Sequence, residues 1–145
     1  MTENNYNDRI IDTLSKFDLK LFIIEYGSNG LVSSILSLAK NSKKVFIGSY
    51  VINNENMLKT LSINQHLKIG DDEFFKDIAF SSLRRTKTDT CLATFIVNDE
   101  FTIVVILLKK VYLKTYNLKD IVNVPTQASV LALSYFSDIL EKCDK

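Results

Sequence analysis

LKLFIIEYGSNG, residues 19–30, is the stretch of sequence that decides the fold. Its first eight residues form a short apolar run that ends at Gly27-Ser28-Asn29-Gly30, which is typical of a buried strand entering a turn. In residues 31–40, which follow, apolar side chains recur at helical spacing on one broad face. A buried strand, a tight turn and an amphipathic helix in this order predict an α/β domain.

Segments of the same two kinds continue to both ends of the chain. Helical spacing predicts helices over residues 6–17, 31–40, 54–63 and 69–87 and from Pro125 onwards, and β-rich runs predict strands over 19–26, 43–52, 90–97, 100–110 and 111–118. The order αβαβααβββα predicts a three-layer α/β/α sandwich with a mixed sheet. Since no linker, repeat or low-complexity segment interrupts this order, we expect one domain over residues 1–145.

Composition and charge restrict the class of protein. The apolar fraction of 46% and the charged fraction of 24% are those of an ordinary globular domain. Eighteen basic and 17 acidic residues leave a net charge of +1, which provides no overall field to attract nucleic acid. The longest apolar stretch, residues 101–108, is shorter than the roughly 20 residues of a membrane-spanning helix. With no signal-peptide pattern at the N-terminus, we expect an intracellular protein, cytoplasmic or nuclear, without nucleic-acid or membrane partners.

Residues that bind metals or form disulfides are sparse. Cys91 and Cys143 lack the spacing of a disulfide framework, so we interpret both as free thiols. The single histidine, His66, has no neighbouring cysteine or carboxylate, and the acidic run at 71–73 suits a helix N-terminus better than a cation. The sequence therefore predicts no metal site and no cofactor.

The strand-to-helix turn is the first candidate site. It contributes Glu25, Ser28, Asn29 and Gly30. Backbone N–H groups at the start of a helix can hold an anion, which makes these residues candidates for ligand binding. The alternative is structural: the glycines allow the turn, and Ser28 or Asn29 caps the following helix.

A serine–lysine pair is the second candidate, because a buried lysine can lose its charge and assist a serine nucleophile. The pair would combine Ser42 or Ser49 with Lys59. A Ser-His-Asp triad has less support, since the chain has one histidine and no G-x-S-x-G turn to present a serine.

Residues 22–62 resemble the CinA C-terminal domain, a family of competence/damage-inducible proteins that includes nicotinamide mononucleotide deamidases. Residues 25–30 (EYGSNG) are similar to the family's E-S-C-T-G-G turn, and residues 46–58 (FIGSYVINNENML) follow its F-x-G-G-x-V-x-Y-x-N-x-x-K pattern. Further on, residues 102–104 match its G-T-V strand and residues 127–133 its final helix. The resemblance implies a CinA-like fold and self-association.

The chain departs from the family at the residues of the proposed catalytic group, which are a serine, a tyrosine and a lysine. The matching positions hold Lys43, Asn53 and Leu58, and only a one-residue shift would use Lys59. The family's glycine-rich G-I-A-G-P loop is replaced by residues 95–99 (FIVND), and the arginines before the last helix by residues 125–126 (PT). Loss of a nucleophile, its base and the anion-binding groups removes several orders of magnitude in rate.

These departures favour a catalytically inactive CinA-like domain that serves as a protein-interaction or oligomeric assembly module. Its partner would be another protein or a second copy, and the candidate interface residues are Phe74, Phe75, Tyr112 and Tyr116. Two alternatives remain open. One is a nicotinamide-nucleotide amidohydrolase (NMN deamidase-like) that uses the serine–lysine pair, and the other is a non-catalytic nucleotide-binding sensor that uses the strand-to-helix turn.

Overall fold

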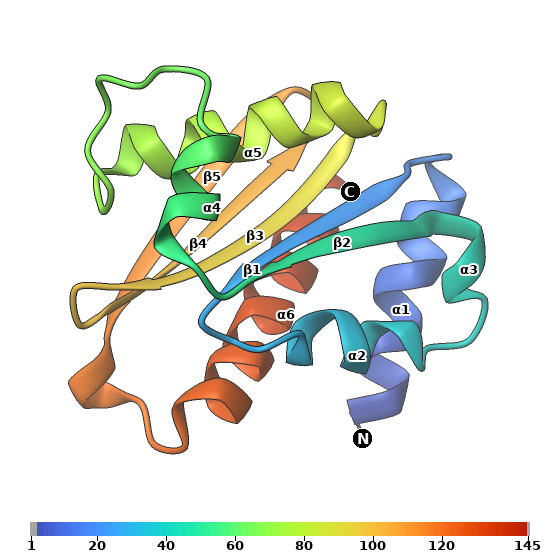
Figure 1. The fold of residues 1–145 in the computed structure, drawn as a ribbon. Coiled ribbons are helices and arrows are strands. Elements are labelled where there is room, and N and C mark those ends of the chain that lie inside the picture. The colour runs from blue at the N-terminus through green and yellow to red at the C-terminus, as the bar shows by residue number, and fades with distance from the viewer. Residues whose placement is uncertain (1–2, 145) are drawn as a thin grey trace.

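The computed structural model describes residues 3–144, which are built around a five-stranded mixed sheet (Figure 1). The strands are β1 (Leu21–Tyr26), β2 (Phe46–Ile52), β3 (Thr90–Val97), β4 (Glu100–Leu107) and β5 (Lys110–Asn117). They lie in the order β2-β1-β3-β4-β5. β1 is parallel to both β2 and β3, whereas β3, β4 and β5 form an antiparallel meander, so the predicted mixed sheet is confirmed.

Helices cover both faces of this sheet. They are α1 (Glu3–Lys16), α2 (Leu31–Ser37), α3 (Ser42–Val45), α4 (Glu55–Leu61), α5 (Asp72–Thr86), the 3-10 helix η1 (Leu118–Asp120) and α6 (Val124–Cys143). Figure 1 shows α4 and α5 on one face and α1, α2, α3 and α6 on the other. The predicted three-layer α/β/α arrangement is therefore confirmed.

The core consists of two apolar clusters, one on each face of the sheet. Successive residues of a strand point to opposite faces, so Ile23 packs among residues of α1 and α6 and Ile24 among residues of α4 and α5. Both side chains are fully buried. β1 is thus covered on both faces, which explains why its sequence is a continuous apolar run without alternation.

Several boundaries differ from the sequence prediction, and one difference changes the kind of element. Residues 43–45, predicted as the start of a strand, belong to the one-turn helix α3, and β2 begins at Phe46. Asn41 precedes this helix in a left-handed conformation with φ of 65°, and the buried Ser42 hydroxyl donates a hydrogen bond to the Ser37 carbonyl at 2.8 Å. These local contacts outweigh the strand preference of the segment. α2 also ends at Ser37, three residues before the predicted end.

The two hairpins have the same geometry but different sequence signals. Each has a two-residue turn in which both residues have positive φ, namely Asn98 (53°) with Asp99 (64°) and Leu108 (51°) with Lys109 (68°). Asparagine and aspartate favour such turns, whereas leucine rarely adopts positive φ. The first turn lies between the predicted strands 90–97 and 100–110, whereas the second lies inside the predicted strand 100–110, so that β4 ends at Leu107 and β5 begins at Lys110.

Gly27 offers a test of how tightly the β1–α2 turn packs against β3. Its φ is +101°, and a Cβ built there would lie 2.7 Å from Ile96 Cβ. We expect Gly27→Ala to lower the free energy of unfolding by about 2–3 kcal/mol, because both the backbone and the neighbouring side chain must adjust. The control is Gly48→Ala, whose Cβ would meet Phe22 at an ordinary 3.6 Å. Urea unfolding of both variants gives the comparison, and equal effects would contradict the interpretation.

Candidate functional site

The carboxylate of Glu25 occupies the N-terminus of α2. Glu25 is fully buried. Its Oε1 accepts hydrogen bonds from the Ser28 hydroxyl at 2.6 Å and the Val32 N–H at 3.0 Å, and its Oε2 accepts from the Ser33 N–H at 2.9 Å and the Ser33 hydroxyl at 2.6 Å. Four donors therefore converge on the Glu25 side chain. The Val32 and Ser33 N–H groups, which could otherwise bind an external anion at the start of α2, already donate to the Glu25 carboxylate.

The remaining residues of the turn support this arrangement. Ser28 is fully buried, and its hydroxyl lies 3.2 Å from Thr94 Oγ1 on β3. The predicted capping of α2 by Ser28 or Asn29 is wrong, because Gly30 is the N-cap residue and no side-chain cap bond is made from it. The signal that would have found the true partner is an acidic residue inside an otherwise apolar strand, since a buried carboxylate needs donors nearby.

The predicted serine–lysine pair is not assembled. Ser42 is buried at the start of α3, with its hydroxyl hydrogen-bonded to a carbonyl. Ser49 is opposite Ile23 in the β1–β2 ladder, so its side chain faces the α1 and α6 side of the sheet. Lys59 lies on α4, on the other side of the sheet. The sheet therefore separates Ser49 from Lys59.

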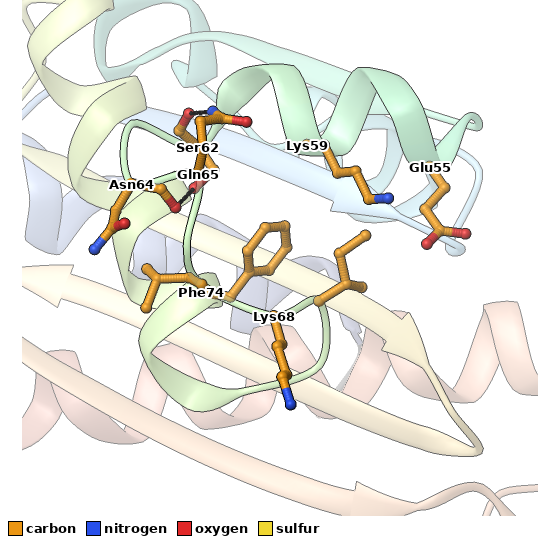
Figure 2. Close-up of a pocket in the computed structure, with 9 residues that line it drawn as sticks. Glu55, Lys59, Ser62, Asn64, Gln65, Lys68 and Phe74 are labelled. Atoms are coloured by element: carbon orange, nitrogen blue, oxygen red, sulfur yellow. Dashed lines mark hydrogen bonds between the residues drawn. The ribbon is translucent and has the colours of Figure 1, made fainter.

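Lys59 instead borders a surface cavity of about 370 Å³ between α4 and the segment that leads to α5 (Figure 2). Its lining residues are Glu55, Lys59, Ser62, Asn64, Gln65, Leu67, Lys68, Ile69 and Phe74. The volume lies at the small end of the range for small-molecule sites. The charged lining residues Glu55, Lys59 and Lys68 are exposed. Figure 2 shows the Lys59 side chain extending along α4 toward Glu55. Sequence reasoning identified only Lys59 and Phe74 among these residues.

The serine of this cavity is held by Asp77. Asp77 Oδ2 accepts hydrogen bonds from the Ser62 hydroxyl at 2.6 Å and from the N–H groups of Ile63 and Asn64 at 2.8 and 3.1 Å. Desolvation raises the pKa of Asp77, but these three hydrogen bonds and the charge of Arg84 outweigh it, so the pKa lies below its ordinary value. A carboxylate with a lowered pKa is a weak general base, so Asp77 anchors the loop rather than activating Ser62.

The three positions that match the proposed catalytic residues of the CinA C-terminal family do not form a site in this structure. Leu58 is fully buried between α4, α5 and the sheet, so its side chain points into the core and away from solvent. Lys43 and Asn53 are exposed. The glycine-rich loop is replaced by the tight turn at Asn98 and Asp99, which joins β3 to β4 without an excursion.

The interface prediction requires a correction at two residues. Phe74 and Phe75 are only 1% and 2% exposed, because both lie on the face of α5 that packs against the sheet. Phe75 stacks on Phe95 of β3 with ring centroids 4.4 Å apart. These two phenylalanines are core residues and present no surface to a partner.

Tyr112 and Tyr116 retain part of their surface. Both are half-buried on the face of β5 that packs toward α6. Tyr116 stacks on Phe101 at 6.3 Å, and the Lys114 ammonium lies 5.1 Å from the Tyr116 ring centroid. Their role in an interface stays a prediction.

The described part of the chain offers no metal-binding group: residues 3–144 contain no cluster of three or more histidine, cysteine or carboxylate side chains. Cys91 and Cys143 are free thiols, as predicted. Burial raises the pKa of the Cys91 thiol, which makes it unreactive. None of the helices formed by residues 3–144 has the length and apolar character that crossing a bilayer requires.

Sheet order and helix placement together define a CinA-like α/β fold. The competence or damage-inducible protein from Enterobacter asburiae has a TM-score of 0.82 at 12% identity, over 97% of this chain and 99% of that one. The competence-damaged protein (CinA) superfamily protein from Escherichia coli has a TM-score of 0.80 at 14% identity, over 98% and 90%.

A third such structure is the competence/damage-inducible protein from Agrobacterium tumefaciens, with a TM-score of 0.80 at 12% identity, over 98% of this chain and 95% of that one. No protein-family model matches the chain, and no curated protein matches it. At these identities the likeness shows the fold, which agrees with the fold expected from the sequence resemblance.

The role of Glu25 is testable by substitution. Glu25→Ala leaves two buried N–H groups and two hydroxyls without their acceptor, and we expect the free energy of unfolding to fall by about 3 kcal/mol. Ser33→Ala is the matched control, since it removes a single donor and should cost about 1 kcal/mol. Chemical denaturation of both variants measures the difference. A Glu25→Ala variant as stable as the parent would contradict the proposed capping role.

Asp77 should make stability depend on pH in the acid range. Because its folded pKa is lowered, its contribution is complete above the ordinary aspartate pKa of about 3.9 and is lost as the pH falls through the folded value. We expect Asp77→Asn to cost about 2 kcal/mol at pH 7 and progressively less below pH 4. Urea unfolding from pH 7 to pH 2 tests this, with Asp12→Asn, at an exposed site on α1, as control. A cost that does not change with pH would exclude the ionised carboxylate as its source.

Proposed function

We propose that this chain is a catalytically inactive CinA-like domain that acts inside the cell as a protein-interaction or oligomeric assembly module. The observation that carries the proposal is that the candidate serines have no base beside them, because the sheet separates Ser49 from Lys59 and the buried Ser42 hydroxyl donates to a backbone carbonyl. At the strand-to-helix turn, the Glu25 carboxylate takes N–H groups that a phosphorylated ligand would need.

The distribution of nucleophiles and bases supports the same proposal. Ser42 donates to a backbone carbonyl, Ser49 is separated from Lys59 by the sheet, and Ser62 donates to a carboxylate with a lowered pKa. In the described part of the chain, none of these serine hydroxyls is hydrogen-bonded to a lysine or histidine that could take its proton. A fold can be retained while its reaction is lost, because function depends on the site carried by the fold.

The cavity beside α4 favours one second candidate function, a nucleotide-binding sensor without turnover. Lys59 and Lys68 border it, and their positive charge suits a phosphate. Both lysines are exposed and Glu55 lies with them, so the net positive charge at the rim is small and screened by solvent.

The first experiment measures chemistry. We expect the purified chain mixed with nicotinamide mononucleotide to release no ammonia above the buffer background, because no serine is activated. Ammonia release that disappears in a Lys59→Ala variant, with unchanged thermal unfolding, would overturn the proposal and establish the amidohydrolase alternative.

A second pair of measurements separates the sensor from the assembly module. A ligand present at 100 times its dissociation constant stabilises a protein by about 3 kcal/mol, which a thermal shift with a panel of nucleotides detects. We expect no shift with the panel. Light scattering of the purified chain and a pull-down from its source cells should instead show a dimer, a larger oligomer or a stable protein partner. A thermal shift that Lys59→Ala and Lys68→Ala abolish would favour the sensor.

A further inference from the structure

The sheet has two edge strands with opposite chemistry. β2 and β5 lie at the two ends of the strand order, so within residues 3–144 each pairs with one neighbour only. Each therefore has backbone N–H and C=O groups on its outer side that can pair with another strand. Figure 1 shows β2 at the edge of the sheet, between α4 and α2.

β5 carries the features that prevent pairing, and β2 does not. Lysines on an edge strand oppose the approach of another strand because they would have to be desolvated, and β5 contains Lys110 and Lys114. β2, with the sequence FIGSYVI, contains no charged residue and no proline. Two of its apolar side chains, Ile47 and Val51, are about half-exposed, at 52% and 47%.

We propose that β2 pairs antiparallel with β2 of a second copy of this chain, which joins the two sheets into one of ten strands, five from each copy. This inference rests on the proposed assembly function and names its surface. An antiparallel pair of identical strands has a two-fold axis at its centre, as the commonest oligomers do. The resulting contact is closed, because each copy uses its free edge once.

The sequence of β2 is complementary to itself in the register that pairs its full length. Ser49 is the middle residue of the strand and lies opposite Ser49 of the second copy. Ile47 then lies opposite Val51, so the two half-exposed apolar side chains cover each other. Gly48 lies opposite Tyr50, whose ring can cover the bare backbone of the glycine. No pair in this register places like charges together.

One irregularity lies at the start of the strand. The β1–β2 register shifts between Leu21 and Phe22, so Leu21 pairs with Phe46, Phe22 with Gly48, and Ile47 has no partner on β1. The regular part of the ladder, from Gly48 to Ile52, includes Ser49 and therefore the proposed centre. A second copy would cover Ile47, which the chain itself leaves half-exposed.

Symmetric disulfide formation tests the proposed centre. Residues opposite each other in an antiparallel pair have Cα atoms about 4.5–5.5 Å apart, which is within the range that a disulfide spans. In a Cys143→Ser background, we expect Ser49→Cys to give a covalent dimer under mild oxidation, and the matched edge variant Val111→Cys on β5 to give no covalent dimer. Cys91 is buried and serves as an internal control. Cross-linking of both variants to the same extent, or of neither, would overturn the proposal.

Lysines introduced into β2 test the energetics. We expect Ile47→Lys with Val51→Lys to raise the dimer dissociation constant about tenfold or more, equivalent to about 1.4 kcal/mol, because four ammonium groups meet at the two-fold axis. The control is Val111→Lys on β5, which should leave the dimer unchanged. Analytical ultracentrifugation measures the constant, and circular dichroism verifies that each variant is folded.

The outcomes separate this inference from the proposed function. A dimer that is insensitive to the β2 lysines and lacks the Ser49→Cys cross-link overturns the inference but leaves an assembly module. If the chain is monomeric at all concentrations but binds a different protein, the inference is likewise overturned and the proposed interaction function remains. Hydrolysis of a nucleotide by a chain that dimerises through β2 overturns the proposed function and leaves the interface.

Discussion

The carboxylate of Glu25 is the interaction on which the middle of the structure depends. Its hydrogen bonds join the end of β1 to the first turn of α2, and the Ser28 hydroxyl extends the network to Thr94 on β3. β1 and β3 are neighbouring parallel strands, and the strand order reverses between them, because β2 is added on one side of β1 and β3 to β5 on the other. A buried charge is stable only when its hydrogen bonds are complete, so this network fixes the turn, the helix and the strand pair together.

The same network limits the chemistry of the molecule. Ligands in open α/β sheets bind beyond the carboxyl ends of parallel strands, at the point where the strand order reverses. In this chain that point is the β1–α2 turn, where a carboxylate on the protein takes the helix donors and Ile96 packs against Gly27. The space available to a small molecule lies to one side, beside α4. The geometry that other α/β proteins use for a ligand is used here for internal stability.

The fold could be predicted from local patterns because those patterns agree with one another. The apolar run of β1, the Asn98-Asp99 turn and the amphipathic stripes of α1, α5 and α6 all have ordinary sequence signals, and the predicted layers followed from them. The α3 turn and the Leu108-Lys109 hairpin could not be predicted in this way. α3 depends on the left-handed Asn41 and on the hydrogen bond from Ser42 to the Ser37 carbonyl, and the hairpin turn places Leu108 at a positive φ that leucine rarely adopts.

The candidate site was less predictable, since it depends on which face each side chain occupies. Ser49 and Lys59 are ten positions apart in the sequence, yet the Ser49 side chain faces the α1 and α6 side of the sheet and Lys59 lies on α4, which covers the other side. Phe74 and Phe75 were predicted as candidate interface residues, but α5 is packed closely enough to bury both, although adjacent residues of a helix point in different directions. The donors to Glu25 come from the turn and from the following helix, a contact that no short motif in the sequence encodes.

Helix α4 shows why a one-residue shift of a catalytic lysine is not a small change. Successive residues of an α-helix are turned by about 100°, so Leu58 and Lys59 cannot share a face. Leu58 and Leu61 are buried in the core, whereas Lys59 borders the cavity. Moving Lys59 into the position of Leu58 would require either a buried, unpaired ammonium or rotation of the whole helix away from the sheet. Packing of the apolar face of α4 thus keeps Lys59 at the cavity rim, and it does so whatever occupies the cavity.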